Sequence, residues 1–191
     1  MSSSEIAVKN ARVVVWPKAL CHRSLGQRPR KKSVIVRFGR RPYSPLTKLY
    51  AHLIFSTKNR SPFLDSGIRG RVHAYLATVF RDMGAPFVVV GGVDDHVHIL
   101  FDMGKMHPPA RFVEQSKRES SKFVKTLGVQ YKKFYWQRGN GMFSVGPTRR
   151  AEVEKYVRNQ EEHHRTITFQ EEFLMFLKRY EVTYDEAYVW D

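Results

Sequence analysis

Two apolar segments joined by a short, glycine-rich turn constrain the fold of this chain most strongly. Residues 86–90 (PFVVV) are apolar throughout, residues 91–95 (GGVDD) have the composition of a turn, and residues 96–102 (HVHILFD) have the pattern of a second strand. A connection this short joins antiparallel strands, because parallel strands need a long crossover. The sequence therefore predicts a sheet that contains an antiparallel pair.

Further strand and helix patterns surround this pair. Strands are also predicted at residues 49–57 (LYAHLIFST) and in a second hairpin, in which residues 134–138 and 142–145 flank the turn GNG. Helical periodicity and capping residues predict helices over residues 65–83, 109–127, 147–164 and 168–180. Hairpins interspersed with helices, without regular βα alternation, predict an α+β fold: an antiparallel, ferredoxin-like or RRM-like sheet with helices packed mainly on one face.

The positive charge of the chain is large and unevenly distributed. Its 191 residues include 33 lysines and arginines against 18 aspartates and glutamates, a formal net charge of +15. Residues 1–44 hold eleven basic residues and one acidic residue. We expect residues 1–44 to form a basic, poorly ordered extension, which is either a tether for nucleic acid or a segment without a role. A chain this basic favours nucleic acid as its partner.

Several classes of protein are disfavoured. A lone cysteine, Cys21, excludes a disulfide framework, a CxxC redox pair and a thiolate zinc finger, and it fits a reducing cytoplasm. No stretch approaches the roughly 18 consecutive apolar residues that span a bilayer, and residues 1–11 lack the apolar core of a secretory signal. The sequence therefore predicts a cytoplasmic protein with no membrane segment.

The strand at residues 96–102 carries two histidines. Because side chains alternate along a strand, His96 and His98 project from one face, while Val97, Ile99 and Phe101 take the other. Two imidazoles side by side on a rigid strand are well placed to bind one divalent cation. Taken alone, the HVH pattern is more typical of two ordinary hydrogen-bonded histidines.

A second polar cluster lies on the helix predicted at residues 147–164. Tyr156, Asn159, Gln160 and His163 share one helix face by their spacing. One interpretation is a tyrosine that packs against the sheet with polar residues at its wet edge. The other is a tyrosine nucleophile one turn before an amide-oxygen metal ligand, since a phenol needs a metal or a base before it attacks a phosphodiester.

Taken together, HVH on a strand and YVRNQ on a later helix resemble the single-tyrosine HUH transposases of the smallest insertion sequences, and most closely the REP-associated tyrosine transposase branch. The resemblance covers residues 45–191 and extends to the segments LIFSTKNRSPFL, GGVDDHVHILFDM, SKRESSKFVK, FYWQRGNGMFSV, NQEEHH, FQEEFL and YDEAYVWD. It implies that residues 45–191 form an HUH catalytic domain with the histidine pair on a central strand.

The resemblance also implies a mechanism. His96 and His98 would bind Mg²⁺ or Mn²⁺ with Gln160 as third ligand, a place for which Asn159 and His163 stay open. Tyr156 would attack single-stranded DNA beside a hairpin, leaving a 5′-phosphotyrosine link and a free 3′-OH that later rejoins strands. A homodimer is implied, in many members with the tyrosine helix of one subunit completing the other's site, so that Tyr156 and His96 of one chain need not be close.

Cations with interleaved aromatic residues indicate where DNA would bind. They occur on the helix at residues 109–127 and in the segment after it, where Tyr131, Tyr135 and Trp136 lie among them. The predicted DNA contacts are Lys117, Arg118, Lys122, Lys132, Lys133 and Arg138. Trp136 is equally well explained as a core residue.

Two other functions compete with the transferase. One is a non-catalytic hairpin-binding protein on the same scaffold, and the other is a metal-dependent phosphodiesterase that uses water as its nucleophile. No Walker loop is present in the sequence, so no nucleotide cofactor is predicted.

Overall fold

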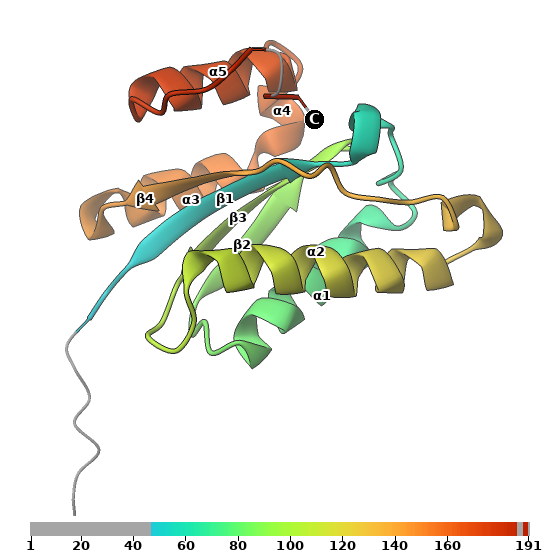
Figure 1. The fold of residues 1–191 in the computed structure, drawn as a ribbon, viewed down its shortest axis with the longest axis horizontal. Helices are drawn as coiled ribbons and strands as arrows, with labels where there is room; N and C mark the ends of the chain where they lie inside the picture. Colours follow the sequence, from blue (N-terminus) through green and yellow to red (C-terminus); the bar gives the residue numbers. More distant parts are fainter. Residues whose placement is uncertain (1–46, 187–188, 191) are drawn as a thin grey trace, which may run out of the picture. The chain divides into compact units, whose positions relative to one another are not determined.

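The computed structural model describes residues 47–186 and 189–190, and the predicted basic extension, residues 1–44, lies outside these residues. One antiparallel sheet of four strands organises the described part of the chain, in the order β2-β3-β1-β4 (Figure 1). The strands are β1 (Tyr50–Ser56), β2 (Val88–Gly92), β3 (His96–Asp102) and β4 (Gly141–Val145). The predicted α+β class, the antiparallel sheet and the central position of the HVH strand are confirmed.

The register of the sheet gathers the histidines on one face and the larger apolar cluster on the other. In the pairing of β1 with β3, His98 lies opposite Ile54 and His96 lies opposite Ser56. Alternation along β1 brings His52 to the same face as His98. The histidines therefore stand together on one side of two neighbouring central strands.

The apolar face is covered by helices α1 (Arg69–Asp82) and α2 (Pro109–Thr126), which lie together below the sheet in Figure 1. The Phe101 ring lies 4.6 Å from Phe80 of α1 and 4.9 Å from Phe112 of α2, measured between ring centroids. Val97 and Ile99 belong to the same buried cluster. Burial of these side chains is the main force that fixes β3 and holds its histidines in place.

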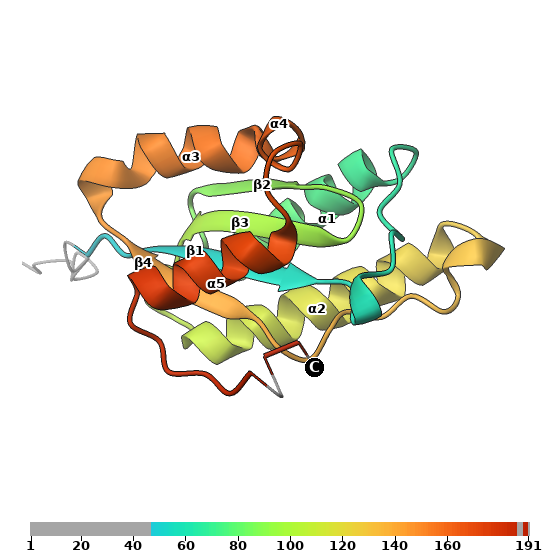
Figure 2. The same cartoon turned by 90° about the horizontal axis from the view of Figure 1, so that it is seen from above.

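Helices also pack on the histidine face. The sequence predicted helices mainly on one face of the sheet, and the structure has them on both. Helices α3 (Arg150–Arg158), α4 (Gln160–His163) and α5 (Phe169–Arg179) lie on the histidine face (Figures 1 and 2). Helix α3 packs through Val157 against Leu100, and α5 packs through Phe173 against Ile54. The Thr168–Glu171 capping box that opens α5 forms as the sequence predicts.

The second predicted hairpin does not form. Residues 134–138 are not a strand, and β4 pairs with β1 instead. Trp136 makes only an isolated bridge to Thr57 and is buried, with its indole N–H donated to Ser120. Tertiary packing of this large ring has outweighed the local turn signal of the GNG segment.

The helix expected over residues 147–164 is divided. It comprises a 3₁₀ turn at Pro147–Arg149, then α3 and α4, with Asn159 between the last two at φ −102° and ψ 28°. Further 3₁₀ turns lie at Lys58–Arg60 and Val129–Tyr131. Within the described residues, no helix combines the length and the apolar character needed to cross a membrane.

Candidate metal and tyrosine site

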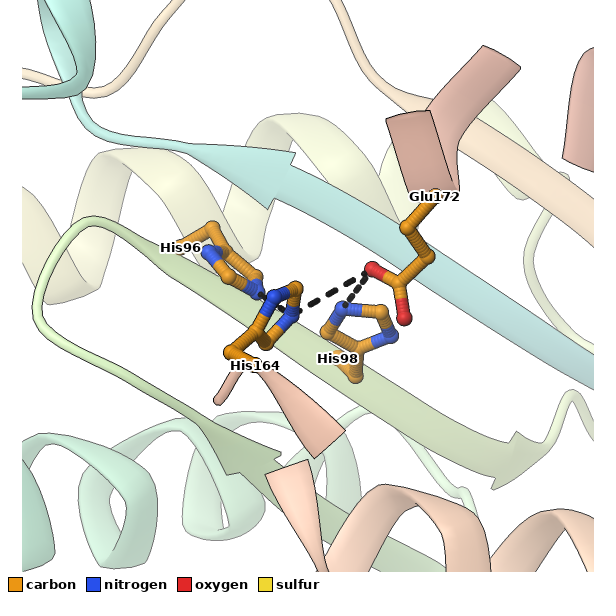
Figure 3. Close-up of side chains that lie close together, drawn as sticks. All are labelled: His96, His98, His164 and Glu172. Carbon is orange, nitrogen blue, oxygen red and sulfur yellow. Dashed lines mark hydrogen bonds and ion pairs between the residues drawn. The ribbon is translucent and has the colours of Figure 1, made fainter. Parts of the chain in front are cut away.

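Four side chains from three elements meet on the histidine face of the sheet (Figure 3). His96 and His98 come from β3, His164 follows α4, and Glu172 comes from α5. One ligand atom from each of the four lies within 4.8 Å of the others. The sequence predicted His96 and His98 as candidate metal ligands. His164 and Glu172 are brought beside them by the fold.

The protons on two of these imidazoles can be assigned from their neighbours. His96 Nδ1 lies 2.6 Å from the carboxylate of Asp95, and His164 Nδ1 lies 2.9 Å from the carbonyl oxygen of Ile167. Both oxygens are acceptors, so each Nδ1 carries the proton and each Nε2 presents a lone pair. The two Nε2 atoms nevertheless lie only 2.9 Å apart. Two lone pairs that face each other at this distance are typical of ligands that share a cation.

Gln160 adds a further acceptor to the same group. Its amide nitrogen donates to the carbonyl oxygen of Tyr156 at 3.3 Å, which turns its carbonyl oxygen toward His164 Nε2 at 3.1 Å. The side chain is buried. Of the three residues that the sequence left open for the third ligand, Gln160 reaches the cluster through its oxygen. Asn159 is exposed, and His163 lies beside Tyr156.

Glu172 links the metal-type cluster to Tyr156. Its Oε2 lies 3.3 Å from His98 Nε2 and 3.5 Å from His164 Nε2. Its Oε1 lies 2.8 Å from His163 Nε2 and accepts the hydrogen bond of the Tyr156 hydroxyl. One buried carboxyl group therefore contacts the histidine cluster with one oxygen and the tyrosine with the other.

The electrostatics of the site favour neutral groups. Burial raises the pKa of Glu172 to about 8 and lowers the pKa of His98 well below its ordinary value. Burial likewise lowers the pKa of His164. His98 Nε2 and Glu172 Oε2 are buried and lie 3.3 Å apart, but neither atom makes a hydrogen bond of good geometry, which is costly unless a further group satisfies them. A divalent cation fits this need, since imidazole nitrogens with carboxylate and amide oxygens are suitable ligands for Mg²⁺ or Mn²⁺.

Tyr156 lies beside the cluster within the same chain. Its ring centroid is 5.7 Å from that of His98 and 5.9 Å from that of His52. The resemblance left open that Tyr156 and the histidines of one chain could lie far apart. In this structure they lie close together.

Glu172 and His164 were not singled out from the sequence, although a signal exists for the first. Phe169 and Phe173 mark the buried face of α5, and Glu172 stands on that face, where a carboxylate without a partner would be costly. An acidic residue at such a position points to a buried polar site.

The residues predicted to contact DNA lie elsewhere. Those on α2 belong to the helix layer on the opposite side of the sheet, and Lys132, Lys133 and Arg138 are exposed in the segment that follows. Arg118 and Lys122 are exposed and pair with glutamates of their own helix. Lys117 differs, because its ammonium group donates to the carbonyl oxygens of residues 137, 138 and 139 at 2.9, 3.1 and 2.6 Å. A phosphate contact by Lys117 would require these bonds to break.

Comparison with known proteins gives a family. The sequence profile described as "Transposase IS200 like" matches residues 45–160. A search among curated proteins finds no match. Among solved structures, the chain is similar to a candidate transposase from Deinococcus radiodurans R1, with 23% identity and a TM-score of 0.48 over 60% of this chain and 92% of that one. It is also similar to a REP-associated tyrosine transposase bound to a REP hairpin, with 13% identity and a TM-score of 0.41 over 57% of this chain and 62% of that one.

Proposed function

The chain belongs to the IS200-like transposase family, and we propose that it is a metal-dependent strand transferase for single-stranded DNA. In this proposal it cuts and rejoins DNA beside hairpins through a 5′-phosphotyrosine intermediate, as in the REP-associated branch. The observation that carries the proposal is the position of Glu172 between the Tyr156 hydroxyl and the Nε2 atom of His98. A nucleophile and a candidate metal site are thereby held together in one chain.

Each residue has a distinct task in the proposed reaction. His96, His98 and His164, with Glu172 and Gln160, would hold Mg²⁺ or Mn²⁺, which when bound stabilises negative charge on the scissile phosphate. Glu172, with a cation bound at its Oε2, would stay ionised, so that its Oε1 can take the proton of Tyr156 as the tyrosine oxygen attacks phosphorus. A bond forms between the tyrosine oxygen and phosphorus while the bond from phosphorus to the 3′-oxygen breaks. The leaving 3′-oxygen takes up a proton from solvent water and becomes the free 3′-OH.

The reverse reaction accounts for rejoining. A 3′-OH from a second strand attacks the phosphotyrosine and releases its proton to solvent water, while the proton held by Glu172 returns to the oxygen of Tyr156. The energy of the phosphodiester is kept in the covalent link, so no nucleotide cofactor is needed.

Several further parts belong to the same proposal. Residues 45–191 would form the catalytic domain, residues 1–44 a basic extension, and the working unit a homodimer in the cytoplasm. Exposed cations would track the DNA backbone, namely Arg118, Lys122, Lys132, Lys133 and Arg138. Lys117 would support them by holding the backbone of residues 137–139, the segment that carries Arg138.

The proposal is tested by trapping the covalent intermediate. Purified protein is incubated with labelled single-stranded hairpin oligonucleotides, taken from the DNA beside its gene, in the presence of Mn²⁺ or Mg²⁺. Tyr156→Phe, His96→Ala and an EDTA sample run beside it on a denaturing protein gel. We expect a DNA-linked protein band with the wild type and metal, and none in the three controls.

The alternatives give different results. Cleaved DNA without a protein adduct, persisting in Tyr156→Phe, would identify water as the nucleophile. Tight binding without metal and without cleavage would leave a hairpin-binding protein. Either result would contradict the transferase.

A further inference from the structure

A cavity adjoins Tyr156 and His52. It lies between α3 and α5 at the end of β4, and its volume is about 160 Å³. The ring of Tyr156 forms part of its wall, while the hydroxyl of the same residue contacts Glu172. Any group in this cavity would therefore lie directly beside the proposed nucleophile.

The walls of the cavity combine flat apolar surfaces with positive charge. Phe176 and Tyr180 contribute aromatic rings, and Arg149 and Arg179 contribute guanidinium groups. Glu152 also lines the cavity, but its carboxylate is bound by two hydrogen bonds from Arg149, at 3.0 and 2.6 Å. Among the described residues, Arg179 has no carboxylate within ion-pair distance. This charge is available to a ligand.

These features select the chemistry of the occupant. Aromatic walls stack against a planar heterocycle, and a guanidinium group binds a phosphate through paired N–H donors. A nucleotide carries both groups. The volume is sufficient for one six-membered ring, since an engineered cavity of about 150 Å³ admits one benzene molecule. The cavity therefore suits a single-ring base better than a purine.

We propose that this cavity binds the pyrimidine base of the nucleotide that adjoins the scissile phosphate, with Arg179 on its backbone phosphate. This inference rests on the proposed single-stranded DNA substrate and adds to it a base-specific subsite. Binding here would hold the DNA strand against the ring of Tyr156 and so orient the phosphate for attack.

The test measures binding to the full chain, with EDTA present so that no cleavage occurs. The probes are fluorescein-labelled hairpin oligonucleotides with single-stranded tails, from the DNA beside the gene, and fluorescence anisotropy gives the affinity. A single abasic site is moved along the tail one nucleotide at a time. We expect one tail position at which the abasic site weakens binding about tenfold, and at which a pyrimidine binds more tightly than a purine.

Two variants and one control connect that position to the cavity. Gly146→Leu adds bulk at the wall, and its backbone tolerates a side chain, because φ is −62° and an added Cβ would meet its nearest atom at 3.9 Å. We expect this variant to bind intact and abasic tails with equal, weakened affinity. Arg179→Ala should weaken binding of every tail about fivefold to tenfold. Lys178→Ala, an exposed neighbour of equal charge that does not line the cavity, should retain the wild-type profile.

The outcomes separate this inference from the proposed function. A flat abasic profile in the wild type, or a sensitive position that survives in Gly146→Leu, would overturn the base subsite even if the phosphotyrosine adduct forms. A sensitive position that prefers purines would overturn the assignment to a pyrimidine. Base-dependent binding that Gly146→Leu removes, in a protein that forms no adduct, would support the subsite and contradict the transferase.

Discussion

His52 Nε2 lies 3.0 Å from His98 Nδ1, and both imidazoles are buried on the same face of the sheet. Burial lowers the pKa of His52 to about 3, so His52 is neutral at physiological pH and its Nε2 can accept a proton donor. If His98 Nδ1 donates to His52, then His98 Nε2 presents its lone pair toward Glu172. His52 is thus in a position to select the metal-binding tautomer of His98.

Removing this acceptor should weaken metal binding. His52→Phe keeps a planar ring but lacks an acceptor, and we expect its affinity for Mn²⁺ to fall about 10-fold to 100-fold, the usual effect of losing such a supporting hydrogen bond. His52→Gln offers an amide oxygen to the same N–H and should retain most of the affinity. Isothermal titration of the metal-free proteins measures both. Equal affinities for the wild type and His52→Phe would show that His52 does not orient His98.

The two adjacent histidines at the end of α4 should differ in their effect on the metal. His164 Nε2 faces His96 Nε2, whereas His163 Nε2 faces the Glu172 oxygen that contacts Tyr156. His164→Ala should therefore lower the affinity for Mn²⁺ at least tenfold, and His163→Ala should change it less than threefold while slowing adduct formation. Titration with Mn²⁺ and the rate of adduct formation at saturating metal separate the two effects. The reverse ranking of affinities would remove His164 from the ligand set.

Glu172 should make the metal-free protein less stable as the pH rises. Its pKa is raised by burial from an ordinary 4.5 to about 8 in the folded protein, so between these values the folded state binds a proton that the unfolded state has lost. Stability is then highest below pH 4.5 as far as this group alone is concerned, and it is lost as the pH rises through 8. The histidines whose pKa values burial lowers are neutral between pH 7.5 and 8.5 in the folded state, and also in the unfolded state, where their ordinary pKa is 6.5. In that window we expect a loss of up to about 1.4 kcal/mol per pH unit.

The matched variant for this effect is Glu172→Gln, which is similar in shape and cannot ionise. Urea unfolding at pH 7.5 and pH 8.5, with EDTA present, should give the wild type a lower free energy of unfolding at pH 8.5 and the variant nearly equal values. Wild-type and variant curves with the same pH dependence would mean that Glu172 does not hold this proton.

The class of fold and the position of the strand histidines could be predicted from the sequence because both depend on local pattern. The alternation in HVHILFD and the turn before it define β3 with the bounds that the structure has. Glu172 and His164 join the site through packing between segments that are far apart in the chain, which no local period encodes. The break at Asn159 is of the same kind, since it accompanies the burial of Gln160 against His164. Burial of a polar side chain by long-range contacts is decided by the whole fold.

Lys117 is a second case in which local pattern and tertiary structure differ. On the sequence it is one cation of a charged helix, but in the fold it donates to three backbone carbonyl groups. We expect Lys117→Met to lower the free energy of unfolding by about 2 kcal/mol, because three backbone carbonyl groups lose a charged donor. Lys122→Met, at an exposed site on the same helix, should change stability by less than about 0.5 kcal/mol and weaken DNA binding in a salt-dependent way. Urea unfolding and anisotropy measure the two effects, and a fully stable Lys117→Met protein would contradict this structural role.

Gly91 allows the tyrosine helix to approach the sheet. A Cβ atom added to Gly91 on β2 would lie 1.8 Å from the carbonyl oxygen of Val157, so an alanine there must displace α3. Since Tyr156 adjoins Val157, its hydroxyl would move relative to Glu172. We expect Gly91→Ala to cost about 1–3 kcal/mol in stability and to slow adduct formation by about 100-fold, because a misplaced nucleophile loses its alignment. Gly70→Ala is the control, since its added Cβ would meet no atom within 4 Å and alanine favours the helix that contains it. Thermal melting and the rate of adduct formation test both variants, and a wild-type rate in Gly91→Ala would show that this close approach does not position Tyr156.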